Sequence, residues 1–195
     1  YYALRLLTTG TKNTAVGALS LDATTTGSNN TSIGEQSLTT NTTGGNNTAV
    51  GTGALALNTT ASDNTAVGYD ALVANTTGSF NTAVGARSLD ANTTGAGNTA
   101  VGEDSLSANT TANDNTAIGQ NALKINTTGA ANTAMGAAAL DANETGSNNT
   151  AVGVSSLTSC TGSSNTAFGH QAGANATSAN NNVFLGHDAG ITGSP

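Results

Sequence analysis

Apolar and polar residues recur along this chain with a constant spacing. The pentapeptide Asn-Thr-Ala-Val-Gly begins at Asn13, and the same pentapeptide or a close variant begins at each later start. The later starts are Asn30, Asn47, Asn64, Asn81, Asn98, Asn115, Asn132, Asn149, Asn165 and Asn182. Every step is 17 residues long except the one from Asn149 to Asn165, which is 16. A fixed period of this length indicates a repeat architecture, in which each unit buries its apolar residues against its neighbours.

Numbering each repeat from its leading Asn shows which positions are apolar. Position 4 is Val, Ile, Met, Leu or Phe in every repeat, and position 9 is Leu in the first nine. Position 5 is always Gly, positions 3 and 8 are nearly always Ala or Ser, and positions 12 to 15 usually spell Asn-Thr-Thr-Gly. The frame divides the chain into a partial repeat at 1–12, ten repeats at 13–181 and a partial terminal repeat at 182–195. We therefore expect the chain to be an excerpt of a longer array.

The repeat favours short strands over helices. Thr, Asn and Gly are weak helix formers, and 17 residues do not make a whole number of helical turns. We expect one strand at positions 2–5, a second around positions 8–11 and a third at positions 13–14, with glycine permitting turns between them. Three sides and three corners form one coil of an all-β parallel β-solenoid, in which identical residues stack about 4.7–4.9 Å apart. A triple β-spiral is the alternative fold.

The same frame predicts what lies inside the coil and how coils are stabilised. We expect inward columns of Val at position 4 and Leu at position 9, and amide ladders of Asn at positions 1 and 12. One buried Val and one buried Leu contribute about 1.5–3 kcal/mol each, whereas ordering each residue of a coil costs about 1–2 kcal/mol. The small residues at positions 3 and 8 give other chains room to approach. We therefore expect a parallel homotrimeric fibre.

Composition and charge exclude several classes of function. The net charge is −7 and the only cations are Arg5, Lys12, Arg87 and Lys124, so no basic stripe for nucleic acid is present. No apolar run approaches the roughly 20 residues of a membrane helix, so we expect no membrane insertion. Cys160 is the single cysteine and cannot form an internal disulfide. No repeat combines a nucleophile, a base and an orienting group, and we expect neither enzymatic activity nor a cofactor.

The consensus Asn-Thr-Ala-Val-Gly-x-x-Ala-Leu-x-x-Asn-Thr-Thr-Gly resembles the repeats of bacteriophage tail-fibre proteins, particularly those of marine cyanophages. The stretch from Asn182 to Gly190 resembles the segment that precedes the C-terminal chaperone domain of such fibres. The Asn-x-x-(Val/Ile)-Gly theme is similar to the head repeats of trimeric autotransporter adhesins, whose coil is shorter. The resemblance covers essentially the whole chain and implies a homotrimeric shaft or receptor-binding segment of an extracellular virion tail. Its implied partners are a host cell-surface glycan or protein and other virion tail proteins.

Two further functions stay open. One is the head of a bacterial trimeric autotransporter adhesin on the bacterial cell surface. The other is an ice-binding or other extracellular solenoid, which the aligned Thr columns at positions 13 and 14 bring into consideration. A strand would turn only one Thr of each adjacent pair outward, which weighs against the ice-binding interpretation.

A few side chains depart from the small-residue pattern. His170 and His187 both occupy position 6 of successive repeats, so we expect them to stack in adjacent coils, and they are weak candidates for a metal site. Tyr69, Phe80 and Arg87 are candidate receptor contacts, because aromatic faces and an arginine suit carbohydrate or peptide ligands. The plainer interpretation of both groups is that they are scattered surface residues.

The carboxylates, the cysteine and the Asn-Thr-Thr segments have simpler explanations than chemistry. We expect the acids to lie at solvated corners, with the adjacent pair Glu103 and Asp104 pointing apart by strand alternation. We expect Cys160 to be a packing variant of a corner Asn. Asn-Thr-Thr also matches a glycosylation sequon, but a corner ladder explains its spacing without a glycan.

Overall fold

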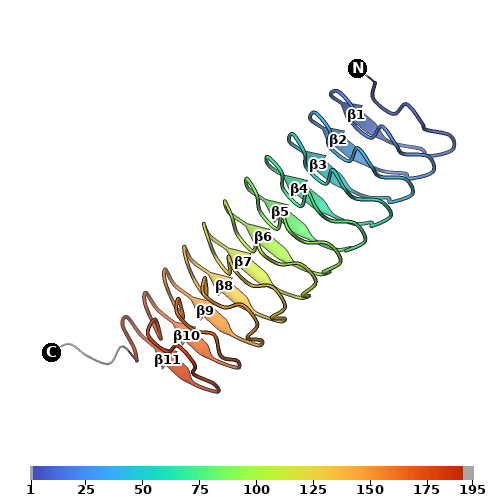
Figure 1. Ribbon diagram of the computed structural model, residues 1–195. Coiled ribbons are helices and arrows are strands. Elements are labelled where there is room, and N and C mark those ends of the chain that lie inside the picture. Colours follow the sequence, from blue (N-terminus) through green and yellow to red (C-terminus); the bar gives the residue numbers. More distant parts are fainter. Residues whose placement is uncertain (1, 191–195) are drawn as a thin grey trace.

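The computed structural model describes residues 2–190, which form an elongated rod of stacked coils (Figure 1). Tyr1 and residues 191–195, which belong to the partial repeats predicted at 1–12 and 182–195, lie outside the described residues. Each strand has three residues and one strand belongs to each coil. The strands are β1 (Thr14–Val16), β2 (Thr31–Ile33), β3 (Thr48–Val50), β4 (Thr65–Val67), β5 (Thr82–Val84), β6 (Thr99–Val101), β7 (Thr116–Ile118), β8 (Thr133–Met135), β9 (Thr150–Val152), β10 (Thr166–Phe168) and β11 (Val183–Leu185).

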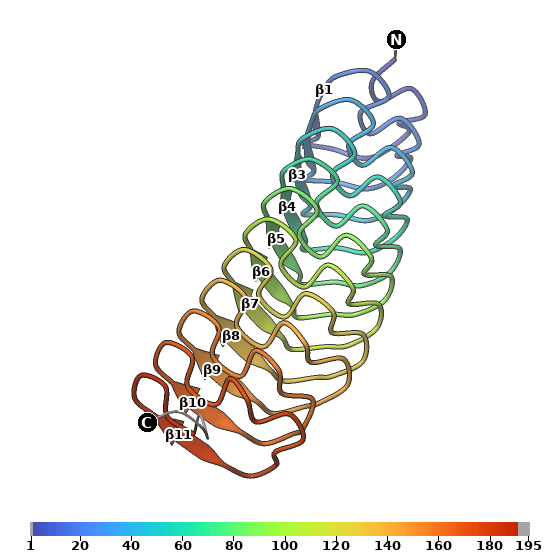
Figure 2. The same ribbon diagram turned by 60° about the vertical axis from the view of Figure 1, so that its left-hand side comes forward.

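The strands form one parallel sheet in chain order from β1 to β11. Each residue pairs with the residue at the same repeat position in the next coil, as in Thr82↔Thr99 and Val84↔Val101. Figure 2 shows the strands following one another along one side of the rod, with loops completing each coil. The predicted parallel β-solenoid of 17-residue coils is therefore confirmed, with about ten coils. Direct pairing of successive repeats is incompatible with a triple β-spiral. Separately, residues 2–190 contain no helix that could cross a membrane.

The prediction of three strands per coil is wrong, because only positions 2–4 are extended. Positions 7 and 9 have left-handed backbone, as at Arg87 (φ 52°) and Leu89 (φ 54°), and the segments after the strand are turns. Neighbouring coils are still joined there by backbone hydrogen bonds. The Leu89 N–H donates to the Ser105 carbonyl (3.0 Å), and the Thr93 N–H donates to the Thr110 carbonyl (2.8 Å).

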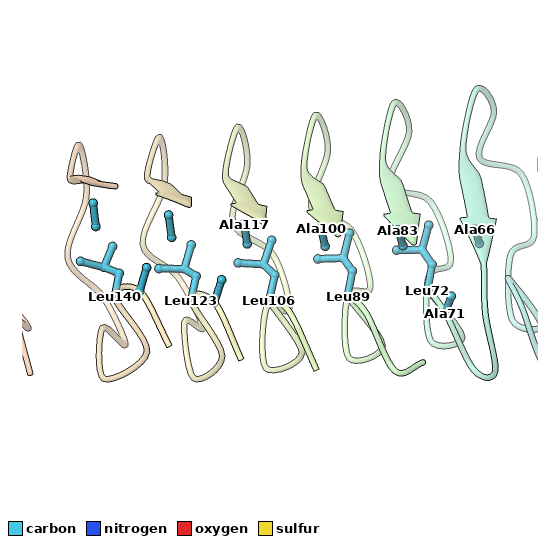
Figure 3. Packing of buried hydrophobic residues seen from close by; sticks show 14 of the residues in the cluster. Ala66, Ala71, Leu72, Ala83, Leu89, Ala100, Leu106, Ala117, Leu123 and Leu140 are labelled. Atoms are coloured by element: carbon cyan, nitrogen blue, oxygen red, sulfur yellow. The ribbon is translucent and has the colours of Figure 1, made fainter. Parts of the chain in front are cut away.

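The interior contains the predicted Leu column but not the predicted Val column. Nine leucines at position 9 are fully buried, namely Leu21, Leu38, Leu55, Leu72, Leu89, Leu106, Leu123, Leu140 and Leu157. The strand turns position 3 inward, so that Ala83 and Ala100 face the Leu column (Figure 3). Position 4 points outward, and Val84 is 36% exposed. Leucine from the opposite wall fills the narrow interior and leaves space only for a methyl group on the strand.

This orientation also overturns one argument for a homotrimer. Positions 3 and 8, which were expected to face partner chains, are buried inside the coil, as at Ala100, Ala117 and Ala122. Small side chains at these positions serve the packing of a single chain. The number of chains in the assembly must therefore be argued from other surfaces.

The two Asn columns are buried at the corners and make different hydrogen bonds. At position 12, Asn92 Nδ2 donates to Asn75 Oδ1 of the preceding coil (2.9 Å) and to the Gly95 carbonyl (3.0 Å). At position 1, Asn81 Oδ1 accepts from the backbone N–H of Asn98 (2.9 Å), and Asn81 Nδ2 donates to the Gly95 carbonyl (2.8 Å). Position 12 is thus the predicted amide ladder. Position 1 joins side chain to backbone in every coil and adds an amide-to-amide bond in some, as from Asn98 Nδ2 to Asn81 Oδ1 (3.2 Å). Both columns satisfy polar groups that burial would otherwise leave unpaired.

The invariant Gly at position 5 is required by backbone geometry. At Gly102 φ is 132°, a conformation that only glycine adopts readily, and a Cβ there would lie 2.7 Å from the backbone of Gly119. The sharp turn after each strand therefore allows no side chain.

Candidate functional site

The most extensive regular surface is the outer sheet face, which we define as the side chains at positions 2 and 4 of the eleven strands. Position 2 is Thr in all strands except β11, and position 4 is always apolar. The exposed fraction of the position-4 side chain is 57% at Val16, 53% at Phe168 and 78% at Leu185. No charged residue occurs at either position, so the face is a continuous stripe of hydroxyl, methyl and other apolar groups along the rod. Exposed apolar surface of this continuity marks interaction sites in soluble proteins.

The Thr columns at positions 13 and 2 differ in what their hydroxyl groups contact. At position 13, the hydroxyl of Thr93 donates to the Thr110 carbonyl of the next coil (3.0 Å), and the same bond recurs in most coils. At position 2, no Thr hydroxyl has a hydrogen-bond partner within residues 2–190. Free hydroxyl groups therefore line the outer sheet face, whereas position 13 of the Asn-Thr-Thr corner uses its hydroxyl groups to join neighbouring coils.

A charged cluster spans three coils around Arg87. Its Nε donates to Asp104 Oδ1 (2.8 Å), its NH2 donates to Glu103 Oε1 (3.1 Å), and Lys124 Nζ contacts Asp104 Oδ2 (3.3 Å). The prediction that Glu103 and Asp104 point apart is wrong, because Asp104 has left-handed backbone (φ 52°) and strand alternation does not apply. The hydrogen bond from Arg87 lowers the pKa of Asp104 and raises that of Arg87. These side chains neutralise one another at the surface.

The three candidate receptor contacts do not form one patch. Tyr69 directly follows the turn after β4 and is 56% exposed, and its carbonyl accepts the backbone N–H of Arg87 (2.9 Å), so these two residues are neighbours. A hydrogen bond with Asp70 raises the pKa of Tyr69. Phe80 is also exposed but lies before β5, at the opposite end of the strands. The structure thus brings two of the three residues together.

His170 and His187 stack as predicted. Their ring centroids are 5.1 Å apart and their planes differ by 13°. Asp188, which was not predicted as a member of this group, lies beside them, with Oδ2 3.1 Å from His187 Nδ1. The available sequence signal was its place directly after His187, and the backbone of Asp188 is left-handed (φ 55°), so strand alternation does not separate the two side chains. The sequence placed the histidines because both follow the invariant Gly.

Cys160 is buried in the position-12 column, as expected for a packing variant. Burial raises the pKa of its thiol, and Asn165 Nδ2 lies 3.4 Å from its sulfur. The Asn residues of the six Asn-Thr-Thr segments are fully buried in the same column, so the folded chain offers none of them to a glycan. These residues are Asn41, Asn58, Asn75, Asn92, Asn109 and Asn126.

No cavity is detected within residues 2–190, and the interior is filled by the Leu, Ala and Asn columns. The described surface therefore offers faces and side-chain clusters for contact. The rod carries three such features: the outer sheet face, the charged cluster around Arg87 and the histidine pair near its C-terminal end. A comparison of the chain with protein-family models and with curated proteins finds no match.

Proposed function

We propose that the chain is a rigid segment of an extracellular attachment fibre, in which parallel copies of the chain associate through the outer sheet face. The observation that carries this proposal is the uninterrupted apolar column at position 4, which is exposed or half-buried in every coil from Val16 to Leu185 and fully buried in none. A solitary rod in water gains nothing from an exposed Val, Ile, Met or Phe in each repeat, whereas an assembly removes this surface from water.

The periodicity of the face favours a second copy of this chain as its partner. An apolar residue recurs at each coil, and coils are separated by one strand spacing of about 4.7–4.9 Å. A partner that contacts every coil needs the same rise along its axis, and a parallel copy in the same register has it. The absence of charge at positions 2 and 4 removes the repulsion that identical surfaces would otherwise experience. Association of three copies is what the resemblance to tail fibres implies.

The surfaces away from the outer sheet face supply the proposed contacts with a host. Positions 6, 7 and 17 vary from coil to coil, and they include Tyr69, Arg87 and Phe80. In the proposed fibre these positions contact a host cell-surface glycan or protein, and the ends of the rod join other virion tail proteins. The proposed location is the virion tail, with a bacterial trimeric adhesin on the cell surface as the alternative.

Sedimentation equilibrium of the purified chain tests the assembly. We expect a mass of three chains, and we expect the double substitution Val84→Lys and Val101→Lys to yield monomers, because it places charge in the contact. The matched control is Thr77→Lys with Thr94→Lys, which adds the same charge at exposed position 14 and should leave the mass unchanged. A wild-type chain that is monomeric at micromolar concentration would contradict the proposal.

Ice binding is the second candidate, and one observation favours it. The Thr hydroxyls and Val methyls of the outer sheet face form a regular array on a continuous parallel sheet, with one rank per coil. This array differs from the Thr pairs at positions 13 and 14 considered from the sequence. The two functions compete for one face, because an assembly that buries it cannot present it to ice. Ice shaping by a monomeric chain, abolished by Val84→Lys, would favour this candidate, and a stable trimer without ice shaping would exclude it.

A further inference from the structure

The two histidines and Asp188 form the one group of three His, Cys, Asp or Glu side chains within residues 2–190 whose geometry permits them to share a metal ion. His170 follows the invariant Gly after β10, and His187 follows the equivalent Gly after β11. The pairing Phe168↔Leu185 fixes the two turns in register, which is why the imidazoles stack 5.1 Å apart. The backbone N–H of Asp188 donates to the His170 carbonyl (3.1 Å), and this bond holds its carboxylate beside both rings.

We propose that His170, His187 and Asp188 bind a divalent transition-metal ion of the Zn²⁺, Co²⁺, Ni²⁺ or Cu²⁺ type. One ligand atom from each residue lies within 4.8 Å of the other two. Zinc lies about 2.0–2.1 Å from each nitrogen ligand, so two ligand atoms on one ion are closer together than about 4.2 Å. A small rotation of the side chains closes this difference, and all three are exposed, so no packing opposes it.

The ligand types select the class of metal. Two imidazole nitrogens with one carboxylate oxygen suit borderline ions such as Zn²⁺, whereas Ca²⁺ and Mg²⁺ take sets made of oxygen ligands. Three protein ligands leave a coordination position for water or for a ligand from outside. The four cations of the chain, the last of which is Lys124, all precede these coils in sequence, and the net charge of −7 favours a cation.

The site joins two coils, and this gives it a consequence for the fold that does not depend on the proposed function. The ion would connect the turn after β10 with the turn after β11, in a region where Gly173 and Gly190 replace the core leucines. Because a metal that binds only the folded coils shifts the equilibrium toward them, it slows the local opening of the last coil. The Asp188 amide is the direct reporter of that opening.

The test is Zn²⁺ titration of the untagged chain by calorimetry, since an oligohistidine tag would itself bind these ions. We expect one ion per chain, visible absorption from tetrahedral Co²⁺, and slower hydrogen exchange at the Asp188 amide when Zn²⁺ is present. His170→Ala and His187→Ala should each weaken Zn²⁺ binding at least about tenfold, and Asp188→Asn should also weaken it. Gln120→Ala, at the same repeat position in an earlier coil, should bind as the wild type does.

Several outcomes would overturn the site. They are no heat of binding with Zn²⁺ at millimolar concentration, undiminished binding in the double variant His170→Ala with His187→Ala, and a preference for Ca²⁺ over Zn²⁺. Full affinity in Asp188→Asn would remove the carboxylate from the proposed ligand set. Because all three side chains are exposed, circular dichroism of each variant should match the wild type, and a loss of binding would then report on the ligands alone.

Discussion

The coils in the middle of the rod and the last described coils fill the same cross-section with different side chains. In the middle coils, from 47 to 148, Ala at position 3 faces Leu at position 9, as with Ala100 and Leu106. The pattern repeats without exception there, and each Leu is completely buried. Stability in this region comes from identical coils that each bury the same set of atoms against both neighbours.

The last described coils, from 165 to 190, exchange the large and small residues. Gly173 and Gly190 occupy position 9, and Phe184 replaces Ala at position 3 of β11. A Cβ on Gly173 would lie 2.7 Å from Phe184 Cδ2, and a Cβ on Gly190 would lie 2.4 Å from Phe184 Cδ1. The aromatic ring therefore occupies space that leucines fill elsewhere, entering from the opposite wall. The comparison shows that the interior of the solenoid must be filled, and that the large side chain can come either from position 9 or from position 3 on the strand.

The position-12 Asn ladder is also regular in the middle coils and interrupted toward the C-terminal end of the rod. It is continuous through the middle coils, but Asn143 Oδ1 has no hydrogen-bond partner within the described residues. The donor that would reach it is missing, because Cys160 stands where the next Asn would be. The coil that contains Cys160 is one residue shorter, yet the Thr150↔Thr166 pairing of β9 with β10 is kept. The missing residue therefore shortens the corner that contains Cys160 and leaves the register of the sheet unchanged.

The largest effect is expected from the core of the middle coils. Leu106→Ala should reduce the free energy of unfolding by about 2–5 kcal/mol, because it removes a fully buried side chain and leaves a cavity between two coils. Urea denaturation followed by circular dichroism measures the change. Leu57→Ala is the matched control, since Leu57 is 48% exposed and its truncation should change stability by about 0.5 kcal/mol or less. Equal effects of the two substitutions would contradict the inward Leu column.

Restoring the middle pattern in the last coils should be unfavourable unless both walls change. Gly173→Leu alone should destabilise the terminal coils by about 1–3 kcal/mol, because the new side chain overlaps the ring of Phe184. Combining it with Phe184→Ala should recover stability, since the two positions then match Leu106 and Ala117, which lie in successive middle coils. Hydrogen exchange of the terminal coils in the two single variants and the double variant measures the coupling. If the stability changes of the two single variants simply add in the double variant, the side chains at positions 173 and 184 do not compete for the same interior space.

Completing the Asn ladder should increase the stability of the fold, by less than the changes expected for the core substitutions. Cys160→Asn places an amide where it can donate to Asn143 Oδ1, and a satisfied buried acceptor stabilises the fold by about 0.5–1.5 kcal/mol. Thermal unfolding under reducing conditions provides the comparison. Cys160→Ala serves as the control, because it removes the thiol without supplying a donor and should not raise the unfolding temperature. An unchanged midpoint in Cys160→Asn would mean that the shortened corner misplaces the amide.

The smallest effect is expected from the charged cluster, which lies on the surface of the middle coils. Arg87 holds the pKa of Asp104 below its ordinary value, so the ionised carboxylate stabilises the folded state above the unfolded pKa of about 3.9. This contribution is lost as the pH falls through the lower folded pKa. A pH series of urea midpoints from pH 6 to pH 2.5 should show a slightly weaker acid dependence in Asp104→Asn than in the wild type. Partial exposure and salt screening keep the difference small.

Much of the architecture followed from the repeat itself. A constant 17-residue step predicts coils that stack in register, and this placed the Leu column, the Asn corners and the stacked pair His170 and His187 from the sequence alone. In a solenoid, one repeat is one coil, so residues at equal repeat positions become neighbours along the axis. Repeat spacing therefore substitutes for knowledge of long-range contacts.

Tertiary structure decided which side chains of the strand point into the coil. Strand alternation permits either position 3 or position 4 to point into the coil, and hydrophobicity alone favours the Val of position 4. The opposite wall settles the choice, because Leu at position 9 already fills the interior and only Ala at position 3 fits against it. The left-handed backbone at Leu89, where a strand was predicted and a turn is found, has the same origin. A non-glycine residue in that conformation costs about 1–2 kcal/mol, and local sequence gives no reason to accept it. Burial of the Leu column and the hydrogen bonds between coils supply that reason, and they exist only once the coils have stacked.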